Sequence, residues 1–264
     1  MLCARLALLL LLPGCSAAVT TGPPAAAVSR DYTETIRGSV VEFDMVWVPE
    51  GEYWIGRHEV TWDEFLLYCD FEETEAVPPG VDAVTKPSKP LDVEPYDRDW
   101  GGGRRPAVGV SWNAAKQYCR WLSLNTGRSY RLPTEDEWTQ ACGDGRSGPL
   151  EEHAWFAANS GGMTQEVGRK APNRRGLHDM LGNLWEYCLS PYDEADPKRA
   201  VLRGGSWKDD ADRVTPEERL RFDNDWVLRD PAMPPGVWWV PDGDHLGFRV
   251  VRSPEKAAEG VSRR

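Results

Sequence analysis

The chain has 264 residues, a formal net charge of −11 and a mean hydropathy of −0.54. Such an acidic chain lacks the basic face with which nucleic-acid-binding proteins hold phosphates, so we expect no nucleic-acid partner. No apolar run reaches the roughly 20 residues of a membrane-spanning helix. The four histidines are spread along the chain and do not predict a multi-histidine metal site.

The N-terminal segment is typical of a secretory signal peptide, with Arg5 followed by the apolar run Leu6–Leu12. The run continues into Pro13-Gly14-Cys15, which resembles a bacterial lipobox, where cleavage leaves the cysteine as a lipidated first residue. We therefore predict a signal peptide over residues 1–18 with lipidation at Cys15. The predicted location is the bacterial cell envelope, as an outer-membrane lipoprotein facing the periplasm or the surface. The alternative is ordinary cleavage after Ala18 and plain secretion.

The body of the chain is predicted from residue 44 onward, after a linker over residues 19–43 that begins with small residues. Residues 44–56 alternate apolar and polar side chains around a Pro-Glu-Gly turn, which predicts strand, turn, strand. Thr61 and Glu64 form a capping-box pattern, so a helix should begin there. Residues 70–106 are acidic and rich in proline and glycine, which predicts a long loop.

The second half of the body combines two predicted helices with strand-like segments. Apolar residues at helical spacing predict a helix over 108–127 that stops at Gly127. A second capping box, Thr134 with Glu137, predicts a short helix that reaches Cys142. Strands are predicted over 201–207 and 246–252, and residues 253–264 are predicted to be a disordered tail.

Four cysteines remain once Cys3 is removed with the signal peptide and Cys15 carries the lipid: Cys69, Cys119, Cys142 and Cys188. An exported chain can form disulfides, and four cysteines allow three full pairings. None of the four lies in a Cys-x-x-Cys motif, so neither zinc nor thioredoxin-type chemistry is predicted. Pairing and buried free thiols both remain open.

Six short motifs occur in a fixed order along the body: Val110-Ser111-Trp112-Asn113-Ala114-Ala115, Tyr118-Cys119, Arg131-Leu132-Pro133-Thr134-Glu135 with Glu137-Trp138, Gly182-Asn183 with Trp185-Glu186, Arg203-Gly204-Gly205-Ser206-Trp207, and Gly247-Phe248-Arg249. Over residues 44–252 this order resembles the formylglycine-generating-enzyme domain, also called the sulfatase-modifying factor domain. The resemblance implies an α+β fold, the irregular formylglycine-generating-enzyme variant of the C-type lectin fold, with little regular secondary structure.

The resemblance also implies where the family's chemistry would lie. Its enzymes oxidise a substrate cysteine with O2, using copper(I) held by two cysteine thiolates. In this chain Asp209 and Val214 stand at those two positions. Soft copper(I) needs sulfur ligands, which neither residue supplies, so no copper and no catalytic residue are expected. Ser206, Trp207 and Trp185 match the family's active-site groove, although packing alone would also explain the two tryptophans.

The resemblance further implies a structural calcium ion. Its ligands would be the side chains of Asp179 and Glu186 and the backbone carbonyls of Gly182 and Leu184. Carboxylate and carbonyl oxygens are the donors that calcium prefers. In the alternative interpretation Asp179 caps a turn and Glu186 pairs with a nearby arginine.

Together these observations predict an exported, non-catalytic member of the family that is anchored by a lipid and binds an unknown ligand or an envelope protein. The charged segment Asp209–Asp225 would face that ligand, or would be a solvated loop. The alternative function is an oxidoreductase or protein-modifying enzyme of the same family. It would carry out formylglycine-type oxidation of a sulfatase cysteine or a related metal-dependent oxidation.

Overall fold

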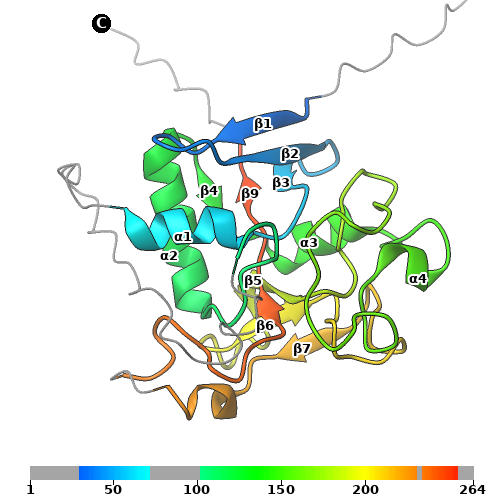
Figure 1. The fold of residues 1–264 in the computed structure, drawn as a ribbon. Helices are drawn as coiled ribbons and strands as arrows, with labels where there is room; N and C mark the ends of the chain where they lie inside the picture. Colours follow the sequence, from blue (N-terminus) through cyan, green and yellow to red (C-terminus); the bar gives the residue numbers. More distant parts are fainter. Residues whose placement is uncertain (1–29, 72–101, 231–233, 255–264) are drawn as a thin grey trace, which may run out of the picture.

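The computed structural model describes residues 30–71, 102–230 and 234–254, which form two small sheets with helices around them (Figure 1). The first sheet is antiparallel and has the strand order β1-β2-β3-β9-β4. Its strands are β1 (Tyr32–Thr35), β2 (Glu42–Val48), β3 (Tyr53–Gly56), β4 (Tyr130–Arg131) and β9 (Val251–Arg252). The predicted strand, turn, strand over 44–56 corresponds to β2 and β3.

The second sheet has the order β7-β6-β5-β8 and contains one parallel pair, β5 with β8. Its strands are β5 (Trp185–Pro191), β6 (Ala200–Arg203), β7 (Arg219–Arg221) and β8 (Leu246–Gly247). The charged segment after β6 therefore contributes β7 to this sheet, followed by a 3₁₀ turn, η2 (Asn224–Val227).

The helices are α1 (Trp62–Asp70), α2 (Trp112–Thr126), α3 (Glu135–Cys142) and the single turn α4 (Leu150–His153). Both predicted capping boxes are present, at Thr61 for α1 and at Thr134 for α3. Helix α2 ends at Gly127, whose φ of +74° is a left-handed conformation that suits glycine. Helix α2 begins four residues later than predicted, because the Ser111 hydroxyl caps it by accepting from the Ala114 amide at 3.0 Å.

Two further predictions about the body are corrected. The segment 19–43 is not a linker throughout, since β1 lies within it and pairs with β2. Residues 246–252 do not form one closing strand. They form β8 in the second sheet and β9 in the first, and the intervening residues Phe248–Val250 are buried as the chain crosses between the sheets.

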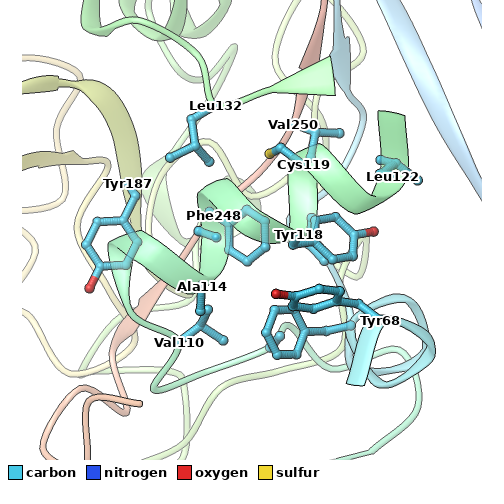
Figure 2. Packing of buried hydrophobic residues seen from close by; sticks show 14 of the residues in the cluster. Tyr68, Val110, Ala114, Tyr118, Cys119, Leu122, Leu132, Tyr187, Phe248 and Val250 are labelled. Carbon is cyan, nitrogen blue, oxygen red and sulfur yellow. The ribbon is translucent and has the colours of Figure 1, made fainter. Parts of the chain in front are cut away.

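Aromatic side chains dominate the larger of two buried hydrophobic clusters. Figure 2 shows Tyr68 of α1, Tyr118 of α2 and Phe248 gathered there. The ring centroids of Tyr118 and Phe248 are 5.4 Å apart. The second cluster lies around Trp138 of α3 and includes Ile55 and Val251 of the first sheet. Both clusters take residues from the two sheets, so they hold the sheets in one body.

Among the described residues, no helix is both long enough and apolar enough to cross a membrane. Cys15 and the signal peptide lie outside the described residues, as does most of the predicted loop 70–106 and of the predicted tail.

Candidate functional site

The two residues at the copper-cysteine positions lie beside the turn that follows β6. Gly204 and Gly205 form this turn with φ of +100° and +80°. A Cβ atom on Gly205 would come within 2.9 Å of Val214 Cγ2, so the turn needs glycine for both its backbone angle and the close approach. Val214 is 2% exposed and packs in the second cluster. It is a core residue with no group that could bind a metal.

Asp209 is tied into a set of hydrogen bonds that we call the Asp209 cluster: Trp185, Ser206, Asp209 and Arg213. Trp185 Nε1 donates to Asp209 Oδ2 over 2.8 Å, and Ser206 Oγ donates to the same oxygen. Arg213 Nη1 lies 3.3 Å from Oδ1. Trp185 and Ser206 are buried, and the Asp209 side chain is 9% exposed. Both carboxylate oxygens are thus engaged within the chain.

Trp207, the third predicted groove residue, makes separate contacts. Its Nε1 donates to the Asp244 carbonyl at 3.0 Å, and its amide donates to the Asn183 carbonyl at 2.9 Å. Two cavities in the described part of the chain, of about 280 and 350 Å³, are lined by other residues. Neither cavity therefore opens onto the predicted groove.

The charged segment after β6 forms ion pairs with the rest of the body. Arg219 Nε and Arg203 Nη1 both donate to Glu135 Oε1 of α3, at 2.6 and 2.5 Å. Arg221 pairs with Asp196 at 2.8 Å. Arg219 and Arg221 therefore tie the segment to α3 and to the loop between β5 and β6.

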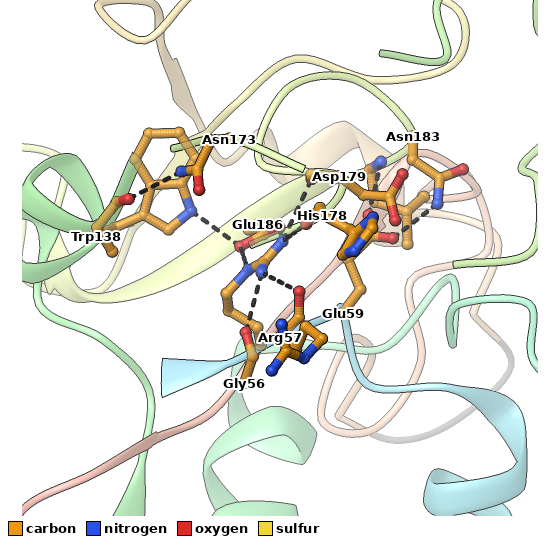
Figure 3. A network of polar contacts seen from close by, with 12 residues as sticks. Gly56, Arg57, Glu59, Trp138, Asn173, His178, Asp179, Asn183 and Glu186 are labelled. Atoms are coloured by element: carbon orange, nitrogen blue, oxygen red, sulfur yellow. Dashed lines mark hydrogen bonds and ion pairs between the residues drawn. The ribbon is translucent and has the colours of Figure 1, made fainter. Parts of the chain in front are cut away.

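The carboxylate of Glu186, the predicted calcium ligand on β5, is bound by protein donors. Arg249 Nη2 donates to Oε1 at 2.6 Å, and Arg249 Nε donates to Oε2 at 2.7 Å. Trp138 Nε1 also donates to Oε2, at 2.8 Å (Figure 3). The interpretation that Glu186 pairs with an arginine therefore describes this structure.

The other predicted calcium ligands lie next to this pair. Asp179 has a φ of +53° and is 2% exposed. Its Oδ2 accepts from the Gly168 amide at 2.7 Å, while its buried Oδ1 has no hydrogen-bond partner among the described residues. Gly182 cannot carry a side chain, because a Cβ would lie 2.2 Å from the Trp155 carbonyl oxygen. The Leu184 amide donates to Glu59 Oε1 at 3.0 Å.

Glu59, which the sequence analysis did not single out, brings a third carboxylate into this buried network (Figure 3). Asn183 Nδ2 donates to its Oε2 at 2.6 Å. Burial, together with the nearby carboxylates of Asp179 and Glu186, raises the pKa of Glu59. Burial likewise raises the pKa of Asp179, to about 6. Three buried carboxylates therefore share one buried guanidinium, that of Arg249.

These residues fit the predicted calcium ion only in part. The open Asp179 Oδ1 and the excess of buried negative charge favour a cation. Glu186 does not fit as it stands, because the Arg249 guanidinium takes both of its oxygens. No group of three or more His, Cys, Asp or Glu side chains in the described ranges is arranged to hold a metal. The predicted calcium site has only two carboxylate side chains and two backbone carbonyls, so that observation does not test it. The calcium site therefore stays a prediction.

Two features of this region escaped the sequence analysis. His58 and His178 are 120 residues apart in sequence, yet their ring centroids are 5.0 Å apart. No local pattern could have shown that pairing. The ion pair of Arg249 could have been predicted, because an arginine within the apolar run Leu246–Val251 indicates a buried ion pair.

Cys69, Cys119, Cys142 and Cys188 are all buried, and the described residues contain no disulfide between them. Burial raises the pKa of Cys119, Cys142 and Cys188. Of the two possibilities left open, the structure therefore shows buried free thiols.

Comparison with known proteins is consistent with this geometry. The model of the sulfatase-modifying factor enzyme 1-like domain matches residues 42–254. An inactive C-alpha-formylglycine-generating enzyme 2 from Mus musculus is 36% identical over 175 residues, which cover 59% of this chain and 52% of the relative. The same-named protein of Bos taurus is 37% identical over 126 residues, 40% of each chain. This chain therefore matches about half or less of these relatives.

Solved structures give the same fold. Treponema denticola variable protein 1 superposes with a TM-score of 0.61 at 24% identity, covering 85% of this chain and 99% of that one. PvdO from Pseudomonas aeruginosa gives a TM-score of 0.54 at 22% identity, covering 86% and 92%. They confirm the predicted irregular α+β fold of C-type lectin type. With its family model matched from strand β2 to the residues after β9, the chain belongs to the sulfatase-modifying factor, or formylglycine-generating-enzyme, family.

Proposed function

We propose that this chain is a non-catalytic, formylglycine-generating-enzyme-like protein that is exported, anchored through Cys15, and binds a ligand or an envelope protein partner. The observation that supports the loss of catalysis is the Asp209 cluster. A carboxylate occupies the first copper-cysteine position and is held by Trp185, Ser206 and Arg213. Val214, at the second position, is part of the core.

The chemistry of this cluster argues against copper(I). A carboxylate is a hard ligand, and an isopropyl side chain is no ligand, whereas copper(I) prefers thiolates. Two relatives carrying the word "inactive" in their names support the same conclusion by similarity.

An oxidation assay tests the proposed loss of catalysis. The full mature chain, loaded with copper(I), would be mixed with a cysteine-containing sulfatase peptide while peptide mass and oxygen uptake are followed. We expect neither conversion nor uptake. The double variant Asp209→Cys/Val214→Cys should gain copper(I) binding, whereas the matched Asp209→Ser/Val214→Ser variant should not. Peptide conversion by the unmodified chain would overturn the proposal, and uptake dependent on another metal would favour the oxidoreductase alternative.

The proposed anchor rests on the sequence around Cys15 alone. In a bacterial host grown with labelled palmitate, the unmodified chain should take up label and fractionate with the outer membrane. Cys15→Ser should lose the label and leave the membrane fraction. A mature N-terminus at Val19 without label would instead establish plain secretion.

A further inference from the structure

A cavity of about 280 Å³ lies where the first sheet meets α1 and the loop before Pro106, away from the Asp209 cluster. This volume is near the lower end of the roughly 300–1,000 Å³ of ligand pockets. Phe43, Val60 and Val250 supply its apolar wall, and its polar lining comprises Thr33, Glu42, Asp44, His58, Glu59, Thr61, Glu64 and Arg104. The cavity can therefore hold a small molecule with both polar and apolar parts.

Two carboxylates in the lining are buried, and they differ in how far the protein satisfies them. Both oxygens of Glu59 accept hydrogen bonds, from Asn183 and from the Leu184 amide. Glu64 is 6% exposed, and its Oε1 accepts from Thr61 N at 3.1 Å and Thr61 Oγ1 at 2.8 Å. The hydroxyl of Tyr118, on α2, also hydrogen-bonds with Glu64, which helps to raise the pKa of Tyr118. Glu64 therefore brings to the cavity a buried carboxylate that forms no ion pair with a described residue.

None of the other lining groups forms an ion pair with this carboxylate. Asp44 pairs with Arg57 at 3.2 Å. Burial and the neighbouring His178 lower the pKa of His58 to about 3, so its ring is neutral. Arg104 is exposed at the rim and forms no ion pair with a described residue. The inner part of the cavity is thus negative when Glu64 is ionised.

We propose that this cavity binds a small organic molecule through its primary ammonium group, which donates to Glu64 Oε2. An ammonium ion supplies the positive charge that Glu64 lacks, together with further hydrogen-bond donors. The alkyl part of the ligand would contact Phe43, Val60 and Val250. The inference rests on the proposed binding role and names a ligand class for it.

Ligand binding should depend on pH. Burial raises the pKa of Glu64 to about 7, while Thr61 and Arg104 act in the opposite direction and Asp63 acts with burial. Tyr118 faces Glu64 from α2, and His58 and Glu59 share the cavity. An ammonium ion stabilises the ionised carboxylate, so affinity should rise as the pH passes through 7. Between pH 6 and pH 8 the ionised fraction, and with it the affinity, changes about tenfold.

Calorimetric titration of the full mature chain with cadaverine tests the proposal, with L-lysine and neutral 1-pentanol as companion probes. Cadaverine should bind at pH 8 and about tenfold more weakly at pH 6, and 1-pentanol should not bind. Tighter binding of L-lysine than of cadaverine would show that the carboxylate of L-lysine also contacts Arg104. Equal binding would show that the ammonium group alone determines the affinity.

The decisive variant is Glu64→Gln, with Asp63→Asn as its matched control one residue earlier on α1. Glutamine can replace glutamate in a capping box, so α1 should still form, which circular dichroism checks. Glu64→Gln should weaken cadaverine binding at least tenfold at pH 8 and remove its pH dependence. Asp63→Asn should retain both, with the pH midpoint slightly lower because the Asp63 charge helps to raise the pKa of Glu64. No binding of either amine, or equal binding by Glu64→Gln, would overturn this inference. Neither result bears on the oxidation assay, which tests the loss of catalysis separately.

Discussion

Arg249 and Glu186 form a two-point ion pair in the interior, with Nη2–Oε1 and Nε–Oε2 distances of 2.6 and 2.7 Å and side chains that are 0% and 1% exposed. Arg249 lies between β8 and β9, where the chain crosses from the second sheet to the first. The same guanidinium donates to the carbonyls of Gly56 and His178, at 3.0 Å each. One side chain therefore connects both sheets and the segment that precedes β5.

Loss of Arg249 should destabilise the fold strongly. Arg249→Ala leaves the Glu186 carboxylate buried without its partner, and breaking a buried pair in this way costs about 3–5 kcal/mol. Arg229→Ala, at an exposed surface pair with Asp242, is the matched control and should cost at most about 1 kcal/mol. Urea unfolding measures both. The double variant Glu186→Leu/Arg249→Met should be more stable than Arg249→Ala, and the interpretation fails if Arg249→Ala unfolds within 1 kcal/mol of the unmodified chain.

Local patterns in the sequence predicted the helices well. The features that these patterns missed depend on pairing between segments far apart in the sequence. The capping boxes at Thr61 and Thr134 correctly predicted the starts of α1 and α3, because a capping box needs only four consecutive residues. The strand β1 was missed because its pairing with β2 is set by register and not by a strong pattern of its own. Residues 246–252 were predicted as one strand because the periodicity of a sequence cannot show that the chain crosses from one sheet to another.

The candidate site was predictable to a similar degree. The loss of both copper cysteines was visible in the residues at 209 and 214. That Trp185, Ser206 and Arg213 would close around Asp209 depends on the turn at Gly204 and Gly205, which brings distant segments together. The hydrogen bonds of Glu59 with Asn183 and Leu184 join residues more than 120 positions apart, so no local sequence pattern could predict them.

The four buried thiols should be protected from reagents in the native state. Because burial raises the pKa of Cys119, Cys142 and Cys188, little reactive thiolate forms at neutral pH. Titration of the mature chain with a thiol reagent, without reductant, should show almost no reaction before unfolding and four thiols after it. Two thiols or none after unfolding would show that disulfides form.

Calcium should stabilise the region around Asp179. Mass spectrometry of the native chain should find about one equivalent of calcium, and a chelator should lower the melting temperature. Asp179→Ala should abolish both effects because it removes the open Oδ1, whereas Glu194→Ala, in an exposed loop, should retain them. A metal-free chain whose melting temperature does not respond to the chelator would rule out this site.

Glu64 should make the chain less stable as the pH rises. Its pKa is raised from 4.5 to about 7 in the folded state, chiefly by burial, so between these values the native chain holds a proton that the unfolded chain has lost. The contribution of Glu64 to the free energy of unfolding is then full below pH 4.5 and decreases up to pH 7, by up to about 3 kcal/mol. Other carboxylates, such as Glu135 and Glu137, have lowered pKa values and act in the opposite sense.

The test is therefore the difference between the unmodified chain and Glu64→Gln in urea unfolding at pH 5 and pH 8. Glu64→Gln should gain stability relative to the unmodified chain at pH 8, and Asp63→Asn should gain much less because Asp63 is a small cause of the raised Glu64 pKa. Parallel pH curves for all three would contradict a protonated Glu64 in the native state.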